Sequence, residues 1–284
     1  MLGRAMAGAA GVLLLGFGWE GYKAAAPDDG LVLGGVRVLP RTTDAAMPHL
    51  WDLAASAGEP VSSAAGAPPL WLVTLRGAGS SLVLATAGWV CGVLVGLLLA
   101  VVMARLARAR AVLLPWVVLS QVVPLIAVAP LVARPDSADG QPWVPVVAIA
   151  SYLAFFPVSI GALRGFTAPD DDRGGLYVDL FRSFGVGWWS GFWRLRLPAS
   201  VPYLLPALRL AAANAVAGTI VAEVYTGLPG GLGRLIVDFG ASAAADPARQ
   251  WSPLLGAILV GLATTLVLAG AATGLRRYRP GEAR

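Results

Sequence analysis

The sequence predicts an all-α membrane protein in which six helices cross a bilayer. Of the 284 residues, 57% are hydrophobic and only 13% are charged, a composition that water-soluble domains rarely have. A helix of about 20 apolar residues crosses the hydrocarbon core of a membrane. Four uncharged runs reach this length, at residues 77–104, 111–133, 140–163 and 250–275.

Two further segments complete the expected crossings. The first covers residues 5–22 and is uncharged as far as Trp19. The basic Arg4 before it and the small residues 24–26 after it also fit a cleavable signal peptide. We expect a retained helix, with the signal peptide as the alternative. The fifth crossing follows Pro198 and contains Arg209, whose long side chain can reach the membrane interface.

The second crossing, residues 80–104, carries Gly88, Gly92 and Gly96 at intervals of four. Small residues repeated in this way let helices approach closely in lipid, where packing drives association. Arginines at 105, 108 and 110 follow, and such clusters mark the cytoplasmic side of a membrane. We therefore expect both termini to be cytoplasmic.

Residues 26–70 are polar and rich in Pro, Gly and Ser, which predicts an external loop. Within this loop, residues 44–57 can form a short amphipathic helix with Leu50 and Leu53 on its apolar side. This helix either packs on the bundle or contacts an extracytoplasmic binding protein.

Residues 179–198 do not fit a crossing, because Arg182, Arg194 and Arg196 would each cost about 2.5 to 3.5 kcal/mol at a bilayer centre. They are also too apolar for a solvated loop. Their aromatic residues recur mostly at intervals of three and four, which predicts one face of a helix. That face needs a partner or lies on the inner leaflet. The residues are Phe181, Phe184, Trp188, Trp189, Phe192 and Trp193.

The same segment contains a series of motifs. Asp179-Leu180-Phe181-Arg182-Ser183 is followed by Gly185, by W-x-x-F-W and by Leu197-Pro198. This series resembles the EAA loop of ABC importer permeases, although two of its three opening letters depart from the general pattern. Its D-L-x-R-S-x-G form is similar to permeases for thiamine- and riboflavin-type precursors within the nitrate, sulfonate and taurine group. The resemblance covers residues 74–275.

The resemblance implies a single permease domain over residues 1–284, built as the six-helix bundle of a type I ABC importer permease. It implies a core at 74–275, the external loop at 26–70 and a cytoplasmic coupling loop at 167–198. A short coupling helix in this loop would dock in a cleft of a separate ATPase. The residues that the resemblance assigns to docking are Asp179, Arg182, Gly185, Trp188, Trp189, Phe192, Trp193 and Pro198.

The third crossing carries S-Q-x-x-P at 120–124 and A-x-A-P-L at 127–131, which also resemble the precursor-transporting branch. The W-F-G that usually comes next is replaced, so segment 132–142 departs from the family pattern. The two matching motifs favour a pyrimidine- or flavin-like precursor over nitrate or sulfonate as the cargo, whereas the altered segment does not support this assignment.

Five polar residues within the crossings are candidates for the translocation path, with ordinary helix packing as the alternative. The acid at 223 falls near the outer end of its crossing, where it is either functional or an interfacial carboxylate in water. The five are Ser120, Gln121, Tyr152, Asn214 and Glu223.

Several functions are excluded by what the sequence contains. The glycine-rich residues 227–233 follow no strand and end in no Lys-Ser or Lys-Thr, so they predict a turn and not a phosphate loop. One cysteine, Cys91, and one histidine, His49, predict no disulfide, metal site, catalytic residue or cofactor. The acidic run at 170–172 is expected to be solvated. The dispersed basic residues argue against nucleic acid.

The expected function is that of a transmembrane permease subunit of a bacterial ATP-driven ABC importer in the inner membrane. The expected partners are ABC ATPase subunits, a second permease copy, identical or paralogous, an extracytoplasmic solute-binding protein and the lipid membrane. A stand-alone secondary transporter or channel is the main alternative, and it would carry charged groups at mid-membrane or repeated halves. A membrane-anchored scaffold would leave the polar residues within the crossings unexplained.

Overall fold

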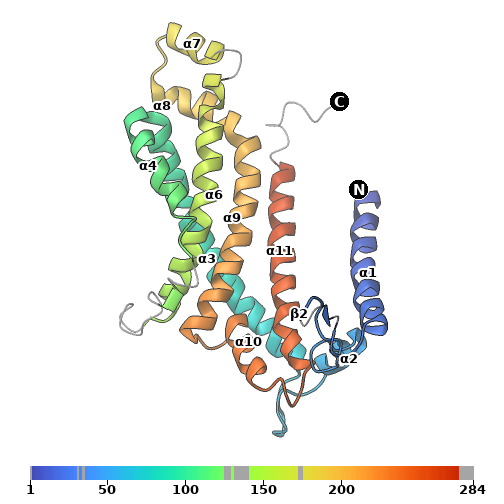
Figure 1. Cartoon of the computed structure of the whole chain (residues 1–284). Coiled ribbons are helices and arrows are strands. Elements are labelled where there is room, and N and C mark those ends of the chain that lie inside the picture. The colour runs from blue at the N-terminus through green and yellow to red at the C-terminus, as the bar shows by residue number, and fades with distance from the viewer. Residues whose placement is uncertain are drawn as a thin grey trace. The chain divides into compact units, whose positions relative to one another are not determined.

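Figure 1 shows the computed structural model of the chain, which describes residues 2–30, 32–33, 36–124, 129–130, 141–171 and 175–274. Most of these residues lie in helices, which confirms the all-helical class. The described strands form one antiparallel pair, β1 (Val32–Leu33) with β2 (Val36–Arg37). The chain divides into two compact units, Met1–Gly77 with Leu235–Gly256 and Ala78–Arg234 with Ala257–Arg284.

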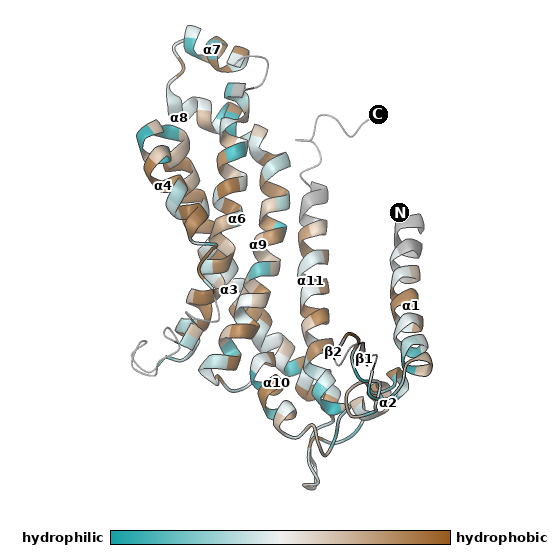
Figure 2. Cartoon of the chain, in the orientation of Figure 1, coloured by the Kyte–Doolittle hydropathy of each residue, from teal (hydrophilic) through white to brown (hydrophobic). Residues whose placement is uncertain are grey.

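Four of the described helical segments are long and apolar enough to cross a membrane, and Figure 2 shows the apolar residues along them. One is a continuous run from Trp188 to Thr226, which consists of α8 (Trp188–Gly191), the π turn η3 (Phe192–Arg196) and α9 (Leu197–Thr226). The others are α3 (Leu70–Arg105), α6 (Trp143–Asp171) and α11 (Ser252–Gly274), which follows the 3-10 turn η4 (Arg249–Trp251).

The predicted helix over residues 111–133 is wrong in its bounds. Helix α4 begins earlier, at Ala107, and ends at Leu119, and residues 120–122 form a turn. A proline has no N–H donor and disfavours helical geometry in the preceding residue, so Pro124 explains why the helix does not continue. Most of the atypical segment 132–142 lies outside the described residues. The count of six crossings stays a prediction.

Helix α1 (Leu2–Ala25) occupies the place predicted for the first crossing, although it is not among the four segments above. Its last turn is joined to the following loop by Lys23, whose ammonium donates to Asp44 Oδ1 at 2.6 Å and to the Thr42 carbonyl at 3.3 Å. This ammonium lowers the pKa of the Asp44 carboxyl below its usual value. The predicted amphipathic helix is present as α2 (Leu50–Ala57).

Helices α3 and α6 approach closely through the predicted glycines. A Cβ added at Gly88 would lie 2.4 Å from the Ala150 Cβ, and one added at Gly92 would lie 2.6 Å from the Ala154 Cβ. Helices α6 and α9 pack in the same way, since a Cβ at Gly161 would lie 2.4 Å from that of Ala207. Small residues therefore set the spacing of these three helices.

We predict that Gly92→Ala destabilises the protein by about 1–3 kcal/mol, because the added methyl group overpacks the contact with α6. Gly79→Ala is the matched control, since a Cβ at Gly79 in the same helix meets no atom within 4 Å. Thermal unfolding of both variants in detergent measures the difference. Equal midpoints for the two variants would contradict the close packing of α3 on α6.

Candidate functional site

The segment predicted to dock forms two helices on either side of a turn. Helix α7 (Leu176–Ser183) ends before Gly185, whose φ of 67° lies in the left-handed region that glycine adopts without a Cβ clash. The Gly185 N–H donates to the Arg182 carbonyl at 2.9 Å and closes the helix end. The prediction that residues 181–193 form one aromatic helix face is therefore wrong, because Gly185 divides them between two helices.

Two aromatic side chains that follow this turn, Trp188 and Phe192, pack on the bundle. Trp188 lies parallel to Phe192 with ring centroids 5.3 Å apart, and the buried Phe192 packs edge-on against Phe166 of α6. The guanidinium of Arg105, at the end of α3, lies 5.5 Å from the Trp188 ring centroid and 5.2 Å from that of Trp189. A cation over an aromatic face is attracted to it. This aromatic cluster thus holds α8 against α3 and α6.

An ion pair between the buried Arg196 and the partly exposed Asp170 fixes the end of the π turn to α6. The Arg196 side chain donates to both carboxylate oxygens of Asp170, at 2.6 and 2.7 Å, and to the Phe166 carbonyl at 2.7 Å. Such bidentate pairs are short, strong and directional. Asp170 is exposed to solvent, as predicted for the acidic run, but it also holds this ion pair, which was not predicted. Sequence reasoning missed this pair because its members are separated by α7 and α8 and share no periodic pattern.

The remaining apolar side chains of this segment are exposed. Phe184 is 76% exposed and Trp193 is 62% exposed, and Leu180 and Trp189 are each about half exposed. Beside them, Arg182 donates to Asp179 at 3.3 Å in a fully solvated pair that contributes little stability. Pro198 lies in the first turn of α9. The segment therefore combines side chains that pack on the bundle with apolar side chains that remain largely exposed, above all Phe184 and Trp193.

The polar residues predicted for a translocation path lie in different places. The Tyr152 hydroxyl donates to the Ser120 carbonyl, and Gln121 is exposed in the turn after α4. Asn214 of α9 donates to the Leu153 carbonyl of α6 at 3.2 Å, which is a contact between helices. The first three residues are thus brought together, whereas Asn214 is not joined to them by a hydrogen bond.

Glu223 is fully buried, so the prediction of an interfacial carboxylate in water is wrong. Its two carboxylate oxygens accept from the Ser81 hydroxyl at 2.8 Å, and one also accepts from the Gly233 N–H at 2.9 Å. Ser81 in turn accepts from the Leu232 N–H at 2.9 Å. The carboxylate thus joins the end of α9 to α3 and to the start of α10 (Leu232–Ala241).

The glycine-rich turn at 227–233 closes over this carboxylate. A Cβ added at Gly231 would lie 2.3 Å from the Glu223 carboxyl carbon, and one at Gly233 would lie 2.4 Å from the Ile220 carbonyl oxygen. The predicted turn is confirmed, but sequence reasoning missed its role. The sequence signal that could have revealed this role is the acidic Glu223, which lies shortly before the glycines of the turn.

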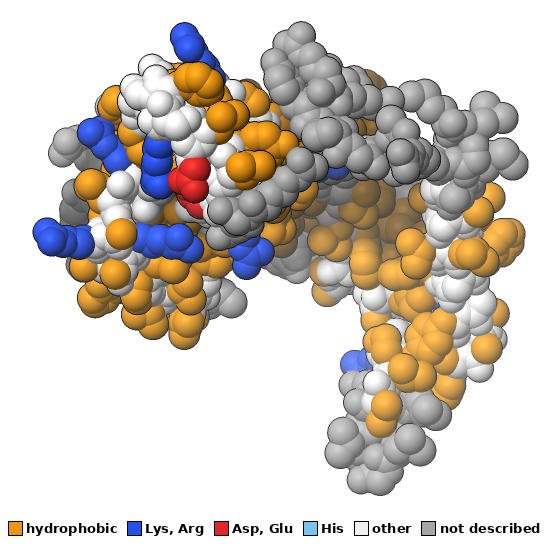
Figure 3. All heavy atoms as spheres, turned by 90° about the horizontal axis from the view of Figure 1, so that it is seen from above, with side chains coloured by type: hydrophobic (Ala, Val, Ile, Leu, Met, Phe, Trp, Pro, Cys, Tyr) orange, Lys and Arg blue, Asp and Glu red, His pale blue; other side chains and the backbone are white. Residues whose placement is uncertain are grey.

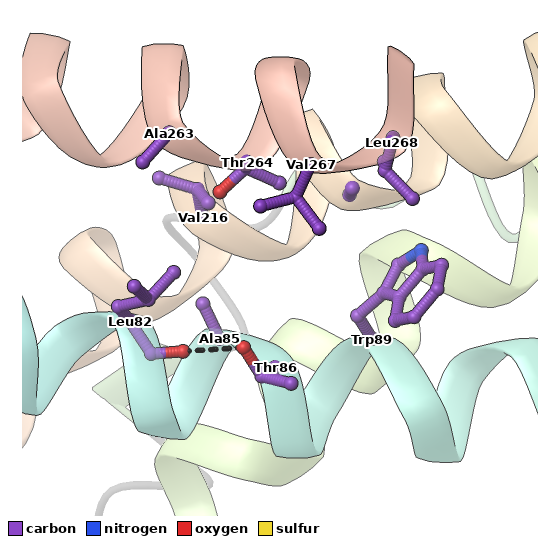
Figure 4. A pocket seen from close by; sticks show the side chains of 10 residues that line it. Leu82, Ala85, Thr86, Trp89, Val216, Ala263, Thr264, Val267 and Leu268 are labelled. Carbon is purple, nitrogen blue, oxygen red and sulfur yellow. Dashed lines mark hydrogen bonds between the residues drawn. The ribbon is translucent and has the colours of Figure 1, made fainter. Parts of the chain in front are cut away.

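A pocket of about 210 Å³ lies between α3, α9 and α11 (Figure 4). Its walls are almost entirely apolar, and its hydroxyl groups bond to their own helices: Thr86 donates to the Leu82 carbonyl at 2.7 Å and Thr264 to the Val260 carbonyl at 2.8 Å. None of the residues predicted for the path lines this pocket. Its chemistry does not suit a polar solute.

An all-helical chain with four apolar segments of membrane-crossing length is a multi-pass membrane protein. The chain belongs to the family of binding-protein-dependent transport system inner membrane components, whose family model matches residues 92–278. This match contains α4, α6 and the whole of the segment built from α7, α8 and the π turn.

Individual relatives carry related names. A protein of Haemophilus influenzae named "Probable ABC transporter permease protein" is 29% identical over 159 residues, which are 56% of this chain and 62% of the relative. The formylaminopyrimidine transport permease protein ThiX of Halalkalibacterium halodurans is 30% identical over 154 residues, 54% of this chain and 58% of the relative. SsuC of Bacillus subtilis, whose name describes an aliphatic sulfonates transport permease, is 28% identical over 154 residues, 54% of this chain and 53% of the relative. The chain therefore spans 53% to 62% of these relatives.

We predict that Arg196→Ala destabilises the protein by about 1–3 kcal/mol, because it breaks a partly buried bidentate pair and leaves the Phe166 carbonyl without its donor. Arg182→Ala is the matched control, since it breaks an exposed pair and should change stability by less than about 1 kcal/mol. Thermal unfolding in detergent compares them. A loss of stability for Arg196→Ala no larger than that for Arg182→Ala would show that the pair of Arg196 and Asp170 stabilises the protein no more than an exposed pair does.

Proposed function

We propose that this chain is the permease subunit of a bacterial ATP-driven importer and that residues 179–198 bind its separate ATPase. The observation that carries this proposal is that the segment combines packed and exposed aromatic side chains. Trp188 and Phe192 face the bundle, while Phe184 and Trp193 are exposed. Buried aromatic anchors dominate the free energy of protein–protein interfaces, so exposed ones at this position favour a docking surface.

The docking surface in this proposal is smaller than the set of residues that the sequence motif indicates. Phe184, Trp189 and Trp193 supply the apolar contact, and the solvated pair of Asp179 and Arg182 lies at its rim. The other four residues act inside the chain. Gly185 forms the turn, Trp188 and Phe192 pack on the bundle, and Pro198 starts α9.

The same contacts supply a route for coupling. The helix is continuous from Trp188 to Thr226, and Arg196 joins it to the end of α6 through Asp170. A displacement of the docking surface would therefore move α6 and α9 together. Closure of two ATPases around ATP would then favour one of two permease conformations, to the extent that each conformation binds the closed ATPases differently.

The finer architecture belongs to the same proposal. It has six crossings in a type I bundle, both termini in the cytoplasm, two permease copies and an extracytoplasmic binding protein that delivers the solute. Gln121 and Tyr152 are retained as path residues, since both are polar and partly accessible between α4 and α6. The buried hydrogen bonds of Glu223 favour a structural role for that residue.

For the cargo we propose a small polar solute of the pyrimidine-precursor class. The name of ThiX describes formylaminopyrimidine transport, and the S-Q-x-x-P motif of this chain points to the same branch. The similarity to SsuC makes sulfonates the competing class. Uptake of a labelled formylaminopyrimidine and of an alkanesulfonate into vesicles holding the complete transporter separates the two classes.

We predict that the double variant Phe184→Ala/Trp193→Ala weakens ATPase binding at least about 30-fold, because each side chain is an exposed anchor and a loss of about 2 kcal/mol corresponds to that factor. Binding of the purified ATPase to the permease in nanodiscs measures this loss. Uptake should fall while membrane insertion and thermal stability are retained.

Trp143→Ala is the matched control, because Trp143 is a partly exposed tryptophan at the opposite end of α6. It should leave ATPase binding unchanged. Wild-type ATPase binding in the double variant would sink the docking proposal. Uptake that persists without any ATPase would instead favour a stand-alone transporter or channel.

A further inference from the structure

Two helices present matching stripes of residues around one groove. On α4 (Ala107–Leu119) the stripe is an arginine followed by two apolar residues at intervals of four. On α6 the order is reversed, with two apolar residues followed by an arginine at the same intervals. Residues four apart lie on one face of a helix. All six line a groove of about 350 Å³: Arg110, Leu114, Val118, Phe156, Ile160 and Arg164.

Both arginines lie at the end of the bundle that carries α8. Arg105 at the end of α3 is separated from α4 by Leu106 and lies over Trp188, while Phe166 follows Arg164 by two residues and packs on Phe192. Figure 3 views the molecule from this end and shows basic side chains spread over its surface. The side chains of Arg110 and Arg164 are exposed, and neither forms an ion pair with a carboxylate among the described residues.

An open face of α4 adjoins the groove. It shares Arg110, Leu114 and Val118 with the groove, and its other residues are Ala107, Ala111 and Pro115. Because all six residues belong to one helix, this face is a shallow apolar surface and not a second pocket. Arg110 thus lies at the head of both the groove and this open face, and Arg164 lies at the head of the groove.

The geometry points to a binding site for one diacyl anionic phospholipid. The guanidinium groups of Arg110 and Arg164 bind the phosphate, since arginine matches phosphate geometry and basic pockets at the ends of membrane helices recognise anionic head groups. One acyl chain lies in the groove, along about 12 Å of helix between Arg110 and Val118, and the other lies on the open apolar face of α4. A soluble phosphate would leave the apolar groove empty, and a polar solute would gain nothing from its walls.

The site is tested with the purified full chain by native mass spectrometry. Phosphatidylglycerol and phosphatidylcholine with identical acyl chains are titrated separately onto wild type and onto Arg110→Gln/Arg164→Gln. We expect wild type to prefer phosphatidylglycerol and the double variant to lose about 25-fold in affinity for it, since one arginine near the head group changes affinity about fivefold. Binding of phosphatidylcholine should be unchanged.

Arg108→Gln is the matched control, because Arg108 is an exposed arginine of the same helix that lines neither the groove nor the open face. It should leave the preference intact. Ile160→Trp should fill the groove and weaken binding of phosphatidylglycerol with both arginines in place. Equal binding of the two lipids by wild type, or an effect of Arg108→Gln as large as that of the double variant, would overturn the site.

Two more outcomes of the titration distinguish the lipid from other occupants of the groove, namely a free anion and a second copy of the chain. Displacement of phosphatidylglycerol by millimolar inorganic phosphate would show an anion site without an acyl-chain site, and it would overturn the lipid assignment. Binding of phosphatidylglycerol to the monomer alone, with none on a dimer, would show that a second copy of the chain covers the groove. Retention of the lipid by the dimer supports the lipid assignment.

Discussion

The guanidinium of Arg196 is the contact on which the rest of the candidate site depends. It joins the π turn to the carboxylate of Asp170 and to a backbone carbonyl of α6, so one side chain satisfies charge and hydrogen bonding at a helix junction. With this junction fixed, Phe192 packs on Phe166 and Trp188 stacks on Phe192. The exposed side chains beyond them then have a defined orientation relative to α6.

The helices next to this junction are held together by close backbone approach at glycines, not by the packing of large side chains. Gly88 and Gly92 bring α3 onto α6, and Gly161 brings α6 onto α9. In lipid, where no water is released from an apolar contact, such close approach supplies the dispersion contacts that hold helices together. At the other end of α9, the Glu223 carboxylate joins α9 to α3. The three helices are therefore suited to move as one body.

The parts of this structure that depend on local pattern could be predicted from the sequence. The apolar runs at 77–104, 140–163 and 250–275, the glycine stripe on α3 and the turn at 227–233 follow from hydropathy, spacing and glycine geometry, and all are present. The parts that depend on long-range contacts could not. Arg196 and Asp170 meet only after α6 and the long helix pack, and the burial of Glu223 depends on Ser81 in a distant helix.

Local rules also failed where two of them competed. Aromatic spacing favoured one helix face, whereas the left-handed conformation at Gly185 ends α7 before that face can form. Hydropathy favoured a continuous helix through 111–133, whereas backbone sterics at Pro124 limit it. In both cases the backbone preference of one residue outweighed the average character of its neighbours.

The π turn at Phe192–Arg196 has a consequence for how the two ends of the long helix are aligned. A π turn accommodates one residue more than the α-helical repeat allows, and each residue of an α-helix advances by about 100°. Residues before and after the turn are therefore offset in rotation by about that angle. The direction in which Trp189 of α8 points is therefore set separately from the face of α9 that packs on neighbouring helices. A single insertion or deletion in the π turn would rotate α8 relative to α9.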